Sequence, residues 1–81
     1  MNQKYVLITG ASRGIGRACA LAFARNHFHV FLNCRHSLDA LHQVEKEILD
    51  EHGSCTLLPG NVGDPDDVRK MFTIIESICP G

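Results

Sequence analysis

The sequence has no strong excess of either charge. Its 81 residues include eight Lys and Arg against nine Asp and Glu, so the formal net charge is −1 at pH 7, and no local cluster of basic residues is present. Proteins that bind nucleic acids or anionic membrane surfaces carry such clusters. We therefore expect neither nucleic acid nor a membrane as a partner.

Long apolar runs are also missing. The run YVLI at positions 5–8 has four residues, whereas the core of a signal peptide needs about 7 to 15 and a bilayer-spanning helix roughly 20. We therefore expect a cytoplasmic chain without a membrane segment. The shares of hydrophobic residues, 44%, and charged residues, 21%, are ordinary for a folded protein, and the length allows one domain at most.

The sequence contains no C-x-x-C pair, which zinc sites and redox motifs commonly use. Its four cysteines are widely spaced, at Cys19, Cys34, Cys55 and Cys79. Among the histidines only His27 and His29 stand close together, and no cysteine or carboxylate joins them. We interpret the cysteines as reduced thiols that pack like small apolar residues, and we expect no metal site.

Apolar periodicity predicts three strands that alternate with three helices. The strands are expected at residues 5–9, 29–34 and 55–58, and the helices at residues 15–26, 38–49 and 65–79. Short connections predict right-handed crossovers and a parallel sheet with the strand order 3-2-1, and the last helix should cross to the opposite face. The whole chain, residues 1–81, is thus expected to form one α/β unit, half of a Rossmann-type fold.

Local residues predict how the helices begin and end. Ser37 and Asp64 are the expected N-caps of the second and third helices, and Pro65 fits the first helical position. Gly53 is expected to adopt the left-handed conformation that ends the second helix. The expected apolar face of the first helix consists of Ile15, Ala18, Cys19, Ala22 and Phe23.

The segment TGASRGIG, residues 9–16, places three glycines between the first strand and the first helix. Gly10 allows a tight turn, Gly14 lets a ligand approach the backbone, and Gly16 permits close packing of helix and strand. The free amides of a helix N-terminus bind anions, so this corner predicts a site for a diphosphate. A P-loop is excluded because Ile15, not glycine, stands five residues after Gly10, and no lysine follows. A glycine turn that merely connects two elements is the simpler alternative.

The spacing T-G-x-x-x-G-x-G resembles the cofactor motif of the short-chain dehydrogenase/reductase family. It is most similar to the short subclass that includes the 3-oxoacyl-(acyl-carrier-protein) reductases, and the order of strands and helices matches over all 81 residues. The resemblance implies a dinucleotide cofactor and an oxidoreductase that reduces a small carbonyl or 3-oxoacyl substrate. On this pattern the cofactor loop comprises Gly10, Ser12, Arg13, Gly14, Ile15 and Gly16.

The end of the second strand favours NADP (NADPH) over NAD. NAD-binding units place an Asp or Glu there for the ribose 2′-hydroxyl, but the sequence NCRHS at 33–37 has no acid before Asp39. Arg35 suits a 2′-phosphate, and Arg13 stands where NADP-dependent family members carry a basic residue. After the third strand the family commonly has Asp-Val. Here Asn61 and Val62 are expected to contact the adenine, because an amide oxygen also accepts a hydrogen bond.

The catalytic residues of the family are not found. The family uses a Ser and a Tyr four residues before a Lys, whereas the only tyrosine here is Tyr5, followed four residues later by Thr9. Complete members run to about 250 residues, so we expect an N-terminal, cofactor-binding part that is inactive alone. A stand-alone adenine-nucleotide-binding module and a purely structural domain are the alternatives. An isolated chain is expected to self-associate through the first strand or the third helix.

Overall fold

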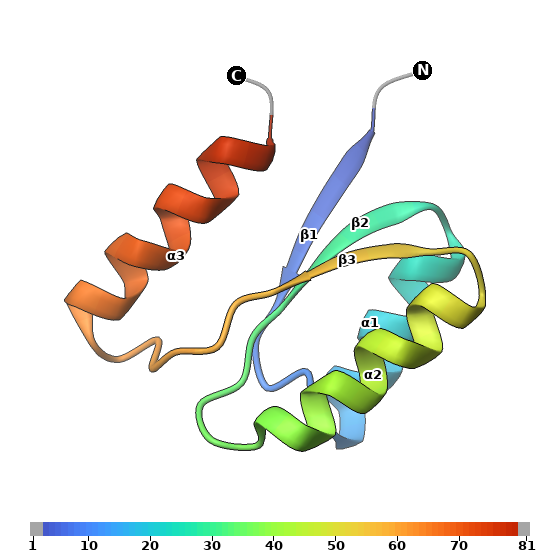
Figure 1. Cartoon of the computed structure of the whole chain (residues 1–81), viewed down its shortest axis with the longest axis horizontal. Helices are drawn as coiled ribbons and strands as arrows, with labels where there is room; N and C mark the ends of the chain where they lie inside the picture. Colours follow the sequence, from blue (N-terminus) through green and yellow to red (C-terminus); the bar gives the residue numbers. More distant parts are fainter. Residues whose placement is uncertain (1–2, 80–81) are drawn as a thin grey trace.

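The computed structural model describes residues 3–79 and contains three strands that alternate with three helices (Figure 1). The elements are β1 (Lys4–Ile8), α1 (Gly14–Arg25), β2 (Phe28–Leu32), α2 (Leu38–Asp50), β3 (Ser54–Leu57) and α3 (Pro65–Ile78). The predicted order and type of all six are confirmed, and no boundary differs from the prediction by more than two residues. None of the helices in this described part is long and apolar enough to cross a membrane.

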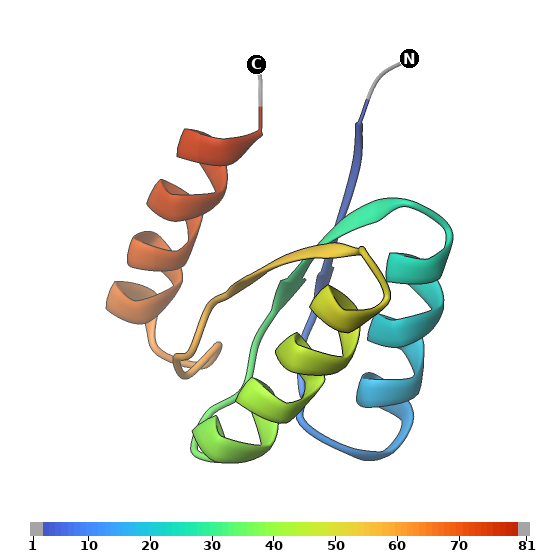
Figure 2. The ribbon, with the colours of Figure 1, turned by 45° about the vertical axis from the view of Figure 1, so that its right-hand side comes forward.

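The three strands form a parallel sheet with β2 in the middle, which confirms the expected order. Val6 of β1 lies opposite Val30 of β2, and Val30 lies opposite Cys55 of β3. Helices α1 and α2 cover one face, and α3 lies on the other, as the turned view in Figure 2 shows. This arrangement places the carboxyl ends of all three strands at the same edge of the sheet.

The main core lies between the sheet and helices α1 and α2. Val30 and Leu32 alternate along β2 toward this face and are fully buried. From α2, the buried side chains are Leu41, Val44 and Ile48. This regular spacing gives α2 its apolar stripe.

The buried face of α1 agrees with the prediction only in part: of the five predicted residues, Phe23 packs against the core and Cys19 is half-buried. The fully or nearly buried residues are Ala20 and Ala24, whereas Ile15 is 85% exposed and Ala18 and Ala22 also face outward. Alanine has little side chain to hold a helix away from its neighbours, so the face with Ala20 and Ala24 allows α1 to lie close to the core. The periodicity of apolar residues alone marks two faces of this helix and does not decide between them.

The second face of the sheet carries a row of rings from adjacent strands. Tyr5 stacks on Phe31 with ring centroids 6.2 Å apart, and His29 meets Phe31 edge-on at 5.2 Å. Both ring nitrogens of His29 lie 2.9 Å from hydroxyl groups of β3, those of Ser54 and Thr56. Burial lowers the pKa of His29 below its ordinary value of 6.5.

Helix α3 rests on this second face through few side chains. Met71 is buried and packs with Phe31 and Leu58, and Ile75 packs against the same cluster. The opposite side of α3 is open, since Phe72 is 51% exposed. The crossing of α3 to this face was expected, but the sequence did not distinguish the covered Met71 from the exposed Phe72.

The structure confirms the predicted N-cap at Asp64, but the predicted left-handed conformation of Gly53 is wrong. Asp64 caps α3 by accepting a hydrogen bond from the backbone N–H of Asp66 at 2.9 Å. At the end of α2 it is His52, not Gly53, that has the left-handed conformation, with φ 65°. The N–H groups of His52 and Gly53 then bond back to the last turn, which is the Schellman arrangement. Gly53 is needed for space instead, because a Cβ there would lie 2.8 Å from Ile48 Cγ2.

The four cysteines are free thiols. Burial raises the pKa of Cys55 to about 11, and the nearby carboxylate of Glu45 adds to the effect. Such a thiol remains protonated at neutral pH and packs as an apolar group. Between residues 3 and 79 no three metal-binding side chains gather at one place.

Candidate functional site

The glycine loop lies where β1 ends and α1 begins. Gly10 has φ +59° and Gly14 has φ +64°, conformations that other residues rarely adopt. A Cβ at either position would meet no atom within 4 Å. The two glycines are therefore required by the course of the backbone, and the loop leaves open space beside both of them.

Gly16 has a different role in the same loop. A Cβ on this residue would lie 2.0 Å from the carbonyl oxygen of Gly10 and 3.2 Å from that of Thr9. The first turn of α1 thus rests directly on the loop and on the end of β1. The expected close packing at Gly16 is present, and it brings the helix N-terminus to the loop. Within the loop Ser12 is buried, with 8% of its surface exposed.

The N-terminus of α1 carries no negatively charged side chain of its own. Its N-cap residue is Arg13, which gives no side-chain cap, and the first turn contains no acidic residue. Helix α3 provides the contrast, because Asp64 caps it and Asp66 and Asp67 stand in its first turn. The free amides and the positive end of the dipole of α1 are thus left without a partner in the described part of the chain. An external anion fits this position.

Two arginines lie in the loops at this edge of the sheet. Arg13 leaves the glycine loop and donates a hydrogen bond from Nη2 to the hydroxyl of Ser37, 3.0 Å away at the start of α2. Arg35 follows directly after β2 and is exposed. Ser37 occupies the predicted N-cap position, but its side chain makes no cap bond and meets Arg13 instead. The side chain of Arg13 therefore spans from the first loop to the second.

The loop after β3 contains the two residues that are predicted to contact adenine, Asn61 and Val62. Asn61 accepts a hydrogen bond at Oδ1 from the N–H of Gly63, at 2.8 Å, and donates its own N–H to Asp67 Oδ2, at 2.9 Å. One lone pair of Oδ1 is thus in use, and the second remains for a further donor. Val62 is 52% exposed. The binding roles of Asn61 and Val62 stay predictions.

Asn33, directly after β2, connects the loops around the candidate site and was not among the predicted site residues. It is 97% buried, and its side-chain amide donates to the carbonyl oxygens of Leu58, at 2.8 Å, and Gly60, at 3.1 Å. Its backbone N–H donates to Ile8, and its carbonyl accepts from the N–H of Ala11. The signal was a polar residue directly after the apolar run Val30 to Leu32, where a buried amide needs partners.

All three loops lie at one edge of the sheet, as the connections after β1, β2 and β3 show in Figure 1. The structure thus brings together the glycine loop, the segment with Arg35 and the segment with Asn61 and Val62. In open α/β sheets, ligands bind outside the carboxyl ends of the strands. The predicted site residues occupy this position.

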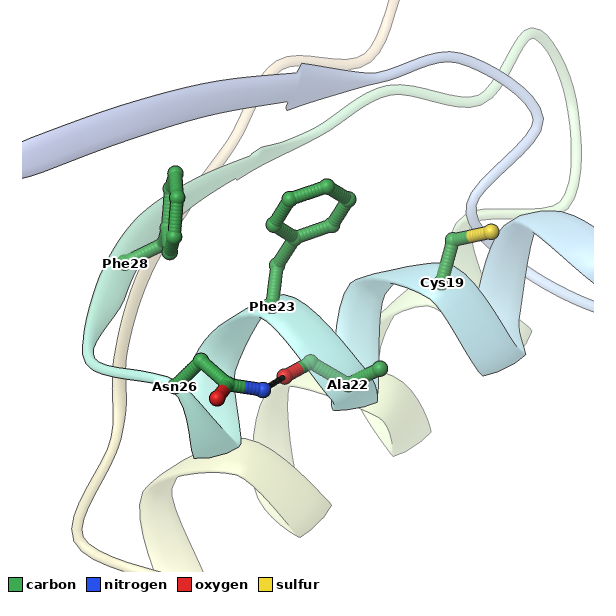
Figure 3. Close-up of a pocket in the computed structure, with 5 residues that line it drawn as sticks. All are labelled: Cys19, Ala22, Phe23, Asn26 and Phe28. Carbon is green, nitrogen blue, oxygen red and sulfur yellow. Dashed lines mark hydrogen bonds between the residues drawn. The ribbon is translucent and has the colours of Figure 1, made fainter.

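A separate apolar hollow lies beside α1, toward the amino ends of the strands (Figure 3). It measures about 290 Å³ and is lined by Cys19, Ala22, Phe23, Asn26 and Phe28. The rings of Phe23 and Phe28 meet edge-on, with centroids 4.9 Å apart. None of these five lining residues is charged, so the hollow as described does not suit a diphosphate.

Comparison with known proteins gives a consistent result. The family model described as short chain dehydrogenase matches residues 4–80. The NADPH-dependent reductase BacG of Bacillus subtilis is 37% identical over 81 residues, which are 98% of this chain and 31% of that protein. A 3-oxoacyl-[acyl-carrier-protein] reductase of Synechocystis is 37% identical over 72 residues, which are 89% of this chain and 29% of that protein.

Solved structures agree with the sequence relatives. The crystal structure of YwfH, an NADPH-dependent reductase involved in bacilysin biosynthesis, has a TM-score of 0.88 at 36% identity and covers 96% of this chain and 33% of its own. A metagenomic short-chain oxidoreductase in complex with NADP has a TM-score of 0.86 at 28% identity, with coverages of 93% and 34%. The chain spans about a third of the length of the proteins it matches. It belongs to the short-chain dehydrogenase family.

Proposed function

We propose that this chain binds NADP(H) and forms the cofactor-binding part of an oxidoreductase that reduces a carbonyl group, of the 3-oxoacyl type or a related small ketone. The observation that carries the proposal is the uncapped N-terminus of α1 behind an open glycine loop, with Arg13 in that loop and Arg35 in the neighbouring loop after β2. Relatives described as NADPH-dependent reductases, and one structure in complex with NADP, support it.

The residues at the sheet edge fit the adenosine and diphosphate half of the cofactor. The open space at Gly10 and Gly14 suits a diphosphate against the backbone amides of the loop and of α1. The 2′-phosphate would be bound by the guanidinium groups of Arg13 and Arg35, as charge-assisted hydrogen bonds. No carboxylate stands between residues 33 and 37 to hold a free 2′-hydroxyl. When bound, the cofactor supplies the hydride that a carbonyl reduction requires.

The proton donor is not among these residues. The only tyrosine, Tyr5, lies in β1 with its ring packed against Phe31 and His29, and its position four residues before Thr9 does not match the family's Tyr and Lys. We therefore assign no catalytic residue within the chain. Its own contribution is to hold and orient the cofactor.

The cofactor preference tests this proposal. The dissociation constants of NADPH and NADH are measured by titration calorimetry for the unmodified protein and for Arg35→Ala and Arg13→Ala. One well-ordered contact to a charged group contributes about 1.5–3 kcal/mol, so NADPH should bind on the order of tenfold to a hundredfold more tightly, and each variant should reduce this ratio.

Arg69→Ala is the matched control, because Arg69 is an exposed arginine of α3 that pairs with Asp66 and lies outside the three loops. It should leave the ratio unchanged. Equal affinity for NADPH and NADH in the unmodified protein would contradict the proposed specificity. Binding of neither nucleotide would contradict the proposed function as a whole.

A further inference from the structure

The segment after β2 is the place where the three loops of the site are joined. Through its backbone, Asn33 extends the sheet beyond β2: its N–H donates to Ile8 at 2.9 Å, and its carbonyl accepts from Ala11 at 2.8 Å. Ile8 is the last residue of β1, and Ala11 lies inside the glycine loop. The backbone of Asn33 therefore holds the glycine loop to the central strand.

The side chain of the same residue holds the loop after β3. Nδ2 of Asn33 donates to Leu58 O at 2.8 Å and to Gly60 O at 3.1 Å. The N–H groups of Leu58 and Gly60 already donate to the backbone of residues 32 and 34, at 2.7 and 3.0 Å. Asn33 thus supplies the partners for the two carbonyls, and Asn61 and Val62 follow directly after this fixed segment.

The side-chain amide of Asn33 matches its two partners. It offers two N–H donors from one planar group, and two carbonyl oxygens face it. An aspartate has a similar shape, but at neutral pH it would place carboxylate oxygens against those carbonyls. A leucine of similar volume would leave both carbonyls without a partner in a buried place, which is unfavourable. The role of the amide is therefore to connect the loops by hydrogen bonds, and its volume alone would not do this.

We propose that Asn33 is a positioning residue for the adenosine half of the dinucleotide: without contacting the ligand, it sets the spacing between the glycine loop and the Asn61–Val62 segment. The inference rests on the proposed function and deepens it. It assigns to Asn33 a share of the affinity for the adenosine moiety that is independent of the 2′-phosphate. The choice between NADP and NAD remains with Arg13 and Arg35.

The experiment uses two probes, adenosine 2′,5′-bisphosphate and AMP, and titration calorimetry at a temperature where circular dichroism shows every variant to be folded. Asn33→Ala should weaken the binding of both probes by about tenfold, equivalent to one lost hydrogen-bonded contact, and leave their ratio unchanged. Arg35→Ala should instead reduce the ratio. If Asn33→Ala does not fold, Asn33→Leu, which fills a similar volume without the two N–H donors, is measured in the same way.

Ile48→Val is the control for stability alone, because Ile48 is a buried core residue of α2, away from the loops. It should bind both probes as the unmodified protein does. A second readout is amide hydrogen exchange, which should become faster at Asn61 and Gly63 in Asn33→Ala and stay unchanged in Ile48→Val.

Each of the following results decides whether Asn33 has the proposed positioning role. Unchanged affinity in a folded Asn33 variant overturns the inference and leaves the proposed function standing. An equal loss of affinity in Ile48→Val also overturns it, because stability would then explain the effect. If the unmodified protein binds neither probe, the proposed function fails, and the inference fails with it.

Discussion

Replacing Gly16 by alanine tests the contact that brings α1 to the glycine loop. The added Cβ would lie 2.0 Å from the carbonyl oxygen of Gly10 and 2.7 Å from its carbonyl carbon. Ordinary contacts of a Cβ begin at 3.4 Å, so the two backbones would have to separate by about 1.4 Å. Both sides of the contact are main chain, and neither can rotate away as a side chain would. The helix must therefore move off the loop.

The expected cost follows from two opposing effects. Forcing extra atoms into a well-packed place costs about 1–3 kcal/mol, and the upper end applies because backbone meets backbone. Alanine gains back about 1 kcal/mol over glycine as a helix former. The free energy of unfolding should thus fall by about 2 kcal/mol. For a domain of this size, 1 kcal/mol corresponds to roughly 4–8 °C in Tm, so Tm should fall by about 8–16 °C.

Thermal and urea unfolding, followed by circular dichroism, measure this effect against two other glycines. Gly63→Ala makes the same chemical change where the nearest atom, Asn61 Oδ1, is 3.2 Å away at the end of a side chain. It should alter stability by less than about 0.5 kcal/mol. Gly14→Ala meets no atom but must keep φ +64°, which costs about 1–2 kcal/mol. A Gly16→Ala variant as stable as the unmodified protein would refute the close approach of helix and loop.

Four further predictions concern the rest of the molecule. Because burial lowers the pKa of His29 below 6.5, the unfolded chain binds more protons between the two pKa values. The free energy of unfolding should therefore fall as the pH drops from 6.5 through the folded-state pKa, and His29→Gln should remove this part of the slope. Since the pKa of Cys55 is raised to about 11, iodoacetamide at pH 8 should modify it more slowly than Cys19 in the folded protein, but equally in urea. The purified 81-residue chain should oxidise no NADPH above background with 3-oxoacyl or simple ketone substrates, as monitored at the absorbance of NADPH, because the family's Tyr four residues before a Lys is not found in this sequence. Leu7, 38% exposed on the edge strand β1, should promote self-association of the isolated chain, and Leu7→Lys should reduce it in sedimentation velocity.

Each of these has a contrary result. A pH slope that His29→Gln leaves intact would assign the titration to other groups. Alkylation of folded Cys55 as fast as that of Cys19 would contradict its raised pKa. Turnover by a homogeneous preparation of the chain would show that it carries its own proton donor. A monomer that unfolds cooperatively at high micromolar concentration, with or without Leu7→Lys, would contradict self-association through β1.

The amino-acid sequence alone determined the order of strands and helices and the place of the glycine loop. These features depend on local chemistry. The spacing of apolar residues distinguishes strands from helices. Asp64 and Pro65 mark the start of a helix. Gly10 and Gly14 permit backbone conformations that other residues avoid. Each signal lies within a few residues of the structure it specifies. The parallel order of the strands followed because short crossovers allow few topologies.

Only the tertiary structure decided which groups meet across the loops. It showed that Asn33 bonds to Leu58 and Gly60, more than 20 residues away, and that Arg13 reaches Ser37. It also selected Ala20 and Ala24 as the buried face of α1. Such pairings depend on how elements distant in sequence pack, and a single side chain's donors or volume do not reveal their partners. Likewise, only the structure showed that His52 has the left-handed conformation at the end of α2 and that Gly53 next to it lies close to Ile48.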